Sequence, residues 1–151
     1  NFGAVQMKAR FAIDTEFNEF GGDLISLALV DIDYPDKKPF YEVLECRHPG
    51  EWVAVHVMPI LNKPAITTAV FRRLLAGFLA KYSAVHIVAD WPDDIRYFCQ
   101  ALITGPGMCI QTPALSFEIR RDIDAESELP HNALADARAI AKKLKELERH
   151  L

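Results

Sequence analysis

Three short apolar runs, separated by turn-forming stretches, lie near the start of the sequence and limit most strongly the folds it can adopt. The runs cover residues 10–15, 24–32 and 40–46. Glycine and aspartate at 21–23, and Pro-Asp-Lys at 35–37, lie between them, and residues of these types favour turns. Short turns connect antiparallel neighbours, so we expect the sheet to begin with three antiparallel strands.

Helical and strand-like segments alternate in the rest of the chain. The expected elements are a short helix within 51–61 that Pro59 ends or bends, a helix within 65–82, a strand at 84–90, a helix at 95–103, an extended stretch at 108–119 interrupted by Pro113, and a helix from Asn132 onward. The apolar residues at helical spacing within 65–82 are Val70, Leu74, Leu75, Phe78 and Leu79. This order predicts an α/β fold, with a mixed five-stranded sheet flanked by helices.

The length and composition limit the classes of protein to which this sequence can belong. The chain has 151 residues, so we expect one domain over 7–151 and treat residues 1–6 as a cloning remnant. No apolar run approaches the roughly 20 residues that span a bilayer, so we expect no membrane partner and a cytoplasmic location. Three scattered cysteines form neither a disulfide nor a zinc pattern. The net charge is −4, and the sequence has no run of basic residues. Both features argue against a protein that binds long duplexes through contacts with many phosphates.

Two acids, Asp14 and Glu16, occupy the first predicted strand. Alternate side chains of a strand point to the same face, so the two carboxylates share one face and Thr15 points to the other. Neighbouring carboxylates repel each other unless a cation neutralises them. A frayed strand end in water would also explain the pair, so it becomes informative only together with other acids.

A second group of acids lies in ADWPDDIRYF at 89–98. Asp90 ends the predicted strand, and Asp94 opens the next helix after Pro92. Asp93 suits the role of an N-cap that satisfies free backbone amides. Asp90 and Asp94 therefore remain alternatives for a functional role.

A third group lies in HNALADA at 131–137. Asp136 falls at the edge of the apolar stripe of the last helix, and no basic residue lies one turn away to pair with it. Its alanine neighbours leave room for a partner from elsewhere. His131, in the loop after Pro130, can lean over the same site, although a single loop histidine is also commonly just solvated.

Taken together, the acids and the histidine form a set that suits two divalent cations. Carboxylate oxygens are hard ligands, which favour Mg²⁺ or Mn²⁺. Two such ions can hold the attacking and leaving oxygens of a phosphodiester displacement. The combination indicates phosphodiester chemistry, which no single group would.

Three stretches in a fixed order carry a family resemblance: DTEF at 14–17, ADWPDDIRYF at 89–98 and HNALADA at 131–137. The sequence resembles the DEDDh 3'-to-5' exonucleases of the ribonuclease H-like superfamily, the group of ribonuclease T, oligoribonuclease and polymerase proofreading domains. The spacing of His, four residues and Asp is typical of the His subclass, and the motifs span nearly the whole chain. The compact size and the segment EWVAVHVMPIL look most like the short bacterial and phage exoribonuclease branch. The resemblance implies a ribonuclease H-like fold.

The resemblance also implies a role for each matching residue. Asp14, Glu16, Asp94 and Asp136 would be the metal ligands, and His131 would be the general base that deprotonates the attacking water. An imidazole with an ordinary pKa of about 6.5 can accept such a proton near neutral pH.

The middle motif departs from the family pattern. Family members have an Asp that opens the helix and is followed by a large apolar residue, which Asp94 and Phe98 match better than Asp90 does. The usual His-Asn before this acid reads Ala89-Asp90 here. Asp94 is therefore the expected ligand, with Asp90 as the alternative.

The resemblance places the terminal base of the substrate against apolar residues that follow the first motif. These would be Phe17 and the stretch around Leu24 and Ile25, with Glu16 and His131 also touching substrate. Stacking on an aromatic ring tolerates any base and needs no basic groove. Phe17 would fit the apolar core almost as well.

The expected function is a metal-dependent exonuclease that releases nucleoside 5'-monophosphates from the 3' end of short single-stranded nucleic acids. RNA is favoured because of the branch that the sequence resembles. The alternatives are a 3'-to-5' exodeoxyribonuclease of the proofreading or repair type, a catalytically silent nucleic-acid-binding module, and a hydrolase of small phosphodiesters or nucleotides. The intact set of acids and histidine argues against the silent module. Because the family often forms homodimers, pairing of two chains is a further expectation.

Overall fold

The sheet is organised around β1, Lys8–Phe17, which has a neighbour on each side. β1 pairs antiparallel with β2, Leu24–Asp31, and parallel with β5, Ala84–Ala89. β3, Phe40–Leu44, continues the antiparallel side, and β8, Ala114–Ile119, runs parallel to β5. The computed structural model describes residues 7–151, so the expectation for residues 1–6 lies outside the described residues.

The sheet has six strands rather than the five expected, in the order β4-β3-β2-β1-β5-β8. The additional strand, β4, is the dipeptide Ala65–Ile66, which runs parallel to the end of β3. Two residues are too few to show strand alternation, so the sequence carries no signal for it. β6, Ile103–Gly105, and β7, Met108–Cys109, form a separate two-stranded sheet. The predicted extended stretch at 108–119 is thus divided between β7 and β8.

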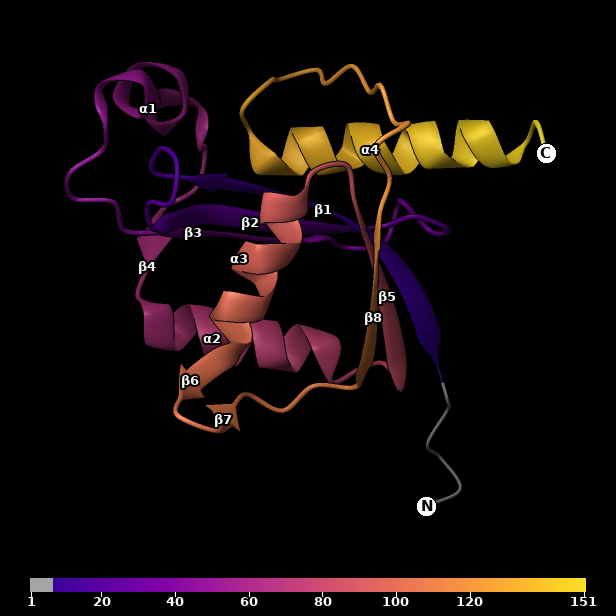
Figure 1. The fold of residues 1–151 in the computed structure, drawn as a ribbon, viewed down its shortest axis with the longest axis horizontal. Coiled ribbons are helices and arrows are strands. Elements are labelled where there is room, and N and C mark those ends of the chain that lie inside the picture. Colours follow the sequence, from indigo (N-terminus) through magenta and orange to yellow (C-terminus); the bar gives the residue numbers. More distant parts are fainter. Residues whose placement is uncertain (1–6) are drawn as a thin grey trace.

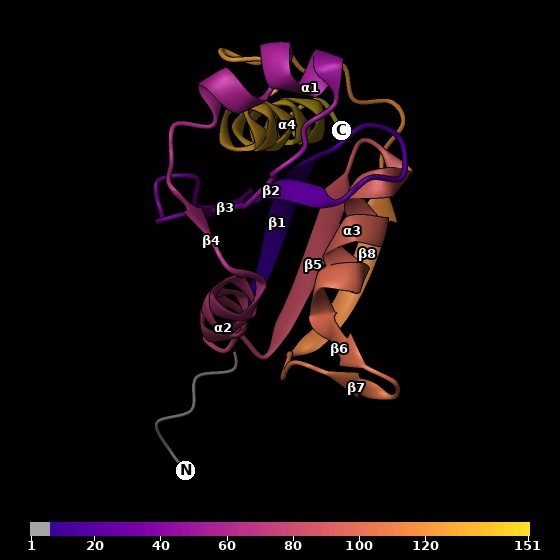
Figure 2. The same ribbon diagram turned by 90° about the vertical axis from the view of Figure 1, so that its left-hand side faces the viewer.

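Helices cover both faces of the sheet, as Figure 1 and Figure 2 show. α1, Glu51–His56, and α4, Ala133–Glu148, lie on one face, and α2, Thr68–Leu79, and α3, Pro92–Leu102, lie on the other. The buried apolar residues divide into two clusters, one under each helical layer. The architecture is therefore α/β, with a mixed sheet between two layers of helices, in agreement with the predicted fold class.

The helices are short or amphipathic rather than uniformly apolar. A 3₁₀ turn at Met58–Ile60 follows α1 and contains Pro59, which agrees with the expected end of that helix. On α2, Phe71, Leu75 and Leu79 are buried, whereas Leu74 is 40% exposed, so the face expected to include Leu74 was wrong. Phe71 continues the four-residue spacing that a buried helix face follows.

Across the described residues, no helix combines the length and apolar character needed to cross a bilayer.

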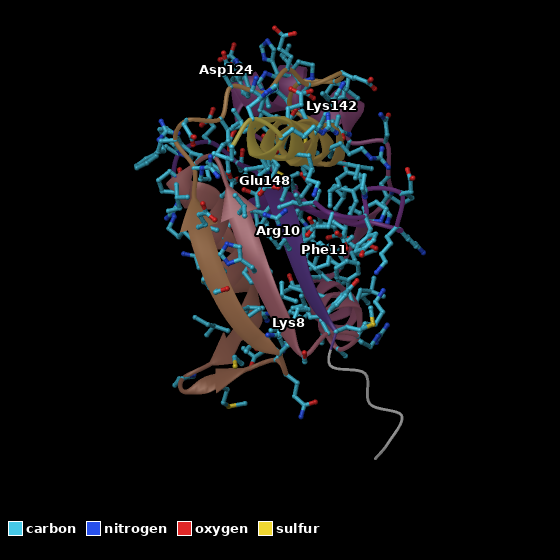
Figure 3. All side chains as sticks on the ribbon, turned by 90° about the vertical axis from the view of Figure 1, so that its right-hand side faces the viewer. Lys8, Arg10, Phe11, Asp124, Lys142 and Glu148 are labelled. Carbon is cyan, nitrogen blue, oxygen red and sulfur yellow. The ribbon has the colours of Figure 1, made fainter. Side chains whose placement is uncertain are left out.

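An ion-pair network fastens the C-terminal end of α4 to the sheet. Arg10 of β1 donates hydrogen bonds to both carboxylate oxygens of Asp33 and of Glu148, over distances of 2.6 to 3.0 Å. Lys145 also donates to Asp33. Figure 3 shows Arg10 on β1 and Glu148 on α4 next to each other. Because these side chains are about one-third exposed, the network orients α4 more than it stabilises the fold.

Candidate metal centre

β1 carries Asp14 and Glu16 on the face that α4 covers. Ala12, two residues before Asp14, belongs to the apolar cluster under α4, and strand alternation keeps the next two even-numbered side chains on that face. Their cross-strand neighbours on β2 are small, Ala28 opposite Asp14 and Ser26 opposite Glu16. The two carboxylates therefore each lie opposite a small side chain of β2.

Asp94 enters the same region from the first turn of α3. The helix begins at Pro92, and Trp91 is the N-cap residue, although its side chain makes no capping hydrogen bond. The expected N-cap role of Asp93 was therefore wrong. Proline suits the first helical position, which starts the helix one residue earlier. Asp94 is buried, and its Oδ1 accepts hydrogen bonds from the backbone amide and the Oγ1 of Thr15, at 3.1 and 2.6 Å. The contact with Thr15 uses only one oxygen of this carboxylate.

The cap of α4 brings His131 beside Asp136. The side chain of Asn132 accepts a hydrogen bond from the amide of Ala135 and donates one to the carbonyl of Ile60. His131 adopts a φ of 74°, which is uncommon for a residue other than glycine. Its backbone amide donates to Oδ2 of Asp136 at 3.2 Å. The chain therefore folds back over the first turn of α4, as a shared site requires.

The acids meet in two groups of three that share Asp14. One oxygen from each of Asp14, Glu16 and Asp136 lies within 4.8 Å of the others, and the same holds for Asp14, Asp90 and Asp94. Segments from β1, the end of β5, α3 and α4 thus converge on one carboxylate. Asp90 accompanies Asp94 rather than replacing it, so both of the sequence alternatives lie in the cluster.

The electrostatics of the cluster fit a cation. Oδ2 of Asp14 is buried and has no hydrogen-bond partner among the described residues. Burial, together with the charges of Asp94 and Glu16, raises the pKa of Asp14 well above its ordinary range. Burial and the charges of Asp136 and Asp94 raise the pKa of Glu16 to about 8. Clustered carboxylate oxygens, one of them buried and unpaired, are suitable ligands for a hard divalent cation.

A cavity of about 530 Å³ adjoins the cluster. It is lined by Asp14, Asp90, His131, Asp136 and part of the loop at 125–130. His131 therefore faces the same space as acids from both groups. This places the histidine where a small ligand held by the acids would also lie.

The apolar residues expected to seat a base lie away from this cavity. The ring of Phe17 stacks on Tyr97 of α3, with centroids 4.5 Å apart. Leu24 lines a separate cavity of about 760 Å³, together with Tyr97. Ile25 is fully buried, which leaves its side chain no surface for a base. Substrate binding by Phe17 and Leu24 stays a prediction.

Trp52 contacts the site and was missed by the sequence analysis. Its indole meets the His131 ring edge-on, with centroids 4.9 Å apart and an interplanar angle of 85°. The indole of Trp52 also stacks on the ring of His56, with the ring centroids 4.5 Å apart. The four-residue spacing of Trp52 and His56 was a visible signal that they neighbour each other on a helix. The contact with His131 joins segments far apart in the sequence, and no local pattern indicates it.

Comparison of the sequence with models of known protein families and with curated proteins gave no match. Any conclusion about function therefore rests on the site itself, because a fold alone does not determine function.

Proposed function

We propose that this protein is a metal-dependent 3'-to-5' exonuclease of short single-stranded nucleic acids. It hydrolyses the phosphodiester bond at the 3' end, acts on RNA in preference to DNA, and releases nucleoside 5'-monophosphates. The observation that carries the proposal is the sharing of Asp14 by two groups of three carboxylates, with His131 facing the same cavity. This donor set suits two divalent cations, Mg²⁺ or Mn²⁺, that share one carboxylate.

The strand order supports the proposal. β3, β2 and β1 are antiparallel neighbours, and β5 and β8 run parallel to β1. This strand order is compatible with the ribonuclease H-like arrangement that the sequence resemblance implies, with β4 as an additional edge strand. Two of the acids lie on the central strand, as expected for a catalytic site built on that fold. Because such folds host many functions, the acids and not the topology carry the proposal.

In the proposed reaction, the acids and the histidine have different roles: the acids would bind the cations and the histidine would accept a proton. The cations would supply the positive charge that a phosphodiester displacement needs at its attacking and leaving oxygens. Glu16 and Asp136 would hold one cation and Asp90 and Asp94 the other, with Asp14 common to both.

His131 would accept the proton of the attacking water. Its backbone is tied to Asp136, and it lines the cavity that the acids share. Positioned bases of this kind contribute about 10²- to 10⁴-fold to a rate.

Exposed aromatic rings fit a single-stranded substrate. Phe20, in the turn between β1 and β2, is 94% exposed, and Trp52, beside His131, is 48% exposed. Bases stack on such rings without regard to sequence. The net charge of −4 disfavours neutralising a long phosphate backbone, so a few terminal nucleotides are the expected length of the bound segment. The preference for RNA rests on the resemblance to the exoribonuclease branch.

Two labelled oligomers test the proposal. A 5'-labelled oligoribonucleotide and the DNA of the same sequence are incubated with Mn²⁺, and the products are separated by length. We expect both to shorten one nucleotide at a time from the 3' end, the RNA faster, with release of nucleoside 5'-monophosphates. The Asp14→Asn variant should leave both intact.

Three results would contradict the proposal. Binding without shortening, equally strong in Asp14→Asn, would favour the silent binding module. Products from cuts inside the strand would exclude an exonuclease. Hydrolysis of a small phosphodiester alone, such as bis-p-nitrophenyl phosphate, would favour the small-substrate hydrolase. Calorimetric titration with Mn²⁺ reports separately whether the acids bind the cation.

A further inference from the structure

We propose that Arg121 binds a backbone phosphate of the single strand at the rim of the acid cluster. The inference rests on the proposed function and adds to it the residue that recognises the anionic part of the substrate. Arg121 is absent from the three motifs, and it lies in the segment that follows β8.

The backbone places Arg121 at the edge of the sheet where the acids gather. β8 runs parallel to β5, so the two strands end side by side, and the amide of Arg120 donates to the carbonyl of Ala89 at 2.7 Å. The guanidinium of Arg121 then donates from Nη1 to the carbonyl of Asp90, at 2.5 Å. The carboxylate of Asp90 belongs to the same group of three as the carboxylates of Asp14 and Asp94. The guanidinium is therefore fixed to the backbone of a residue in the cluster.

A second contact restrains the same guanidinium. Its Cζ lies 4.5 Å from the centroid of the Trp91 ring. A cation over an indole face is attracted by the ring, and an arginine held at two points loses less conformational freedom when it binds a ligand. Arg121 is thus held in place although its side chain is exposed.

Despite this location, Arg121 has no carboxylate partner in the part of the chain that the structure describes. No carboxylate oxygen there lies within 4.0 Å of its nitrogens, whereas Arg120 pairs with both Glu118 and Asp122. Burial raises the pKa of Asp90, and the nearby charge of Arg121 opposes part of this increase. Its hydrogen bond to Asp90 uses one of five N–H donors. The remaining donors form a fork that matches the oxygens of a phosphate.

Arg121 also has a purely structural explanation, because its contacts connect the end of β8 to the start of α3. If this were its only role, replacing Arg121 would lower the stability of the fold and leave phosphate binding unchanged. A phosphate contact would instead change the affinity for the strand and its dependence on salt, because each phosphate contact releases counterions.

The test measures binding without turnover. A fluorescein-labelled single-stranded oligoribonucleotide is titrated with protein in Ca²⁺, and anisotropy is read at several salt concentrations. The variants are Arg121→Gln, Arg121→Lys and, as a matched control, Arg120→Gln, which removes the same charge from a neighbour that is already paired. Circular dichroism melting checks that each variant is folded.

We expect Arg121→Gln to weaken binding about tenfold, the effect of losing one charged hydrogen bond. The slope of log K against log salt should fall by about 0.7. Arg121→Lys should lie between this variant and the wild type, and Arg120→Gln should bind like the wild type. In the exonuclease assay, Arg121→Gln should raise KM and leave kcat nearly unchanged.

Equal affinity and equal slope in the wild-type and Arg121→Gln proteins would overturn the inference, including the case in which neither binds. An equal loss in Arg120→Gln would also overturn it, because the effect would then be general charge. If the strand binds through Arg121 but is never shortened, the inference stands and the proposed exonuclease activity fails. If the wild type shortens the strand and Arg121→Gln does so with the same KM, only the inference fails.

Discussion

Asp94 of α3 accepts two hydrogen bonds from Thr15 of β1, one from its backbone amide and one from its hydroxyl. Thr15 lies between Asp14 and Glu16 in sequence, but its side chain points to the opposite face of the sheet. The residue that separates the two strand acids therefore holds a third acid by one oxygen. This contact connects the first motif to the second and makes the position of Asp94 depend on β1.

Replacing the Thr15 hydroxyl should weaken both the fold and the site. In Thr15→Val, the shape is nearly preserved and Asp94 loses one donor, so we expect a loss of about 1.5–3 kcal/mol in the free energy of unfolding. Affinity for Mn²⁺ should fall as well, because the carboxylate is less firmly held. Urea denaturation and calorimetry measure the two effects. Thr112→Val, at an exposed position outside the helices and strands, should change neither. Wild-type Mn²⁺ affinity in Thr15→Val would show that this contact does not position a ligand.

Neutralising Asp14 should stabilise the metal-free protein while removing its cation binding. The amide of Asn has nearly the same shape and carries no charge, so Asp14→Asn relieves repulsion among acids that burial and neighbouring charges hold at raised pKa values. We expect a higher melting temperature than wild type in EDTA and no stabilisation by Mn²⁺. Asp124→Asn, at an exposed site, is the charge-matched control. A lower melting temperature for metal-free Asp14→Asn would argue that the carboxylate has a structural role.

The metal-free protein should lose stability as the pH rises. The pKa of Glu16 is about 8 in the fold against an ordinary 4.5. A group with a raised pKa in the folded state contributes stability that is complete below the unfolded value and is lost as the pH rises through the folded value. The free energy of unfolding in EDTA should therefore fall between about pH 4.5 and about pH 8. The opposite effect of Asp33, whose pKa is lowered to about 2, lies below this window.

Denaturation with urea at a series of pH values measures this slope. Mn²⁺ should restore more stability near pH 8 than near pH 5, because the cation competes with protons for the carboxylates. Glu16→Gln should make the metal-free profile less steep, and the raised pKa of Asp14 should keep part of the slope. A profile that rises with pH in this window would contradict the account of the cluster.

Trp52 should act on the rate through His131. Among the described residues, the imidazole of His131 makes no hydrogen bond, and its ring contacts the indole of Trp52 edge-on. His131→Asn, which tolerates the positive φ, should lower kcat by about 10²- to 10⁴-fold with Mn²⁺ affinity retained. Trp52→Ala should also lower kcat, and Trp52→Phe should recover much of the loss.

A double-mutant cycle separates this role from base stacking. If Trp52 orients His131, Trp52→Ala costs nothing further in the His131→Asn background. If Trp52 instead stacks on a substrate base, the same change raises KM in both backgrounds.

Local spacing allowed part of the carboxylate cluster to be predicted from the sequence. Asp14 and Glu16 are two positions apart, which places them on the same face of a strand. The position of Asp136 at the edge of an apolar stripe requires a partner from elsewhere. All three acids belong to one group of carboxylates in the fold. The choice between Asp90 and Asp94 was beyond the sequence, because it depends on how the end of β5 and the first turn of α3 approach β1.

Features that depend on long-range contacts or on very short elements were not predictable. β4 has only two residues and exists because the end of β3 offers it a partner. The contact between Trp52 and His131 depends on how α1 lies next to the cap of α4. On α2, the choice of Phe71 over Leu74 for the buried face depends on the rotation of the helix against the sheet.

Crystals soaked in Mn²⁺ test the central claim, that Asp14 joins two cation sites, most directly. Anomalous diffraction at the manganese edge locates each ion and its ligands without relying on activity. We expect two ions that both contact Asp14, one also held by Glu16 and Asp136 and the other by Asp90 and Asp94. No ion at saturating Mn²⁺, or ions that do not contact Asp14, would contradict the claim.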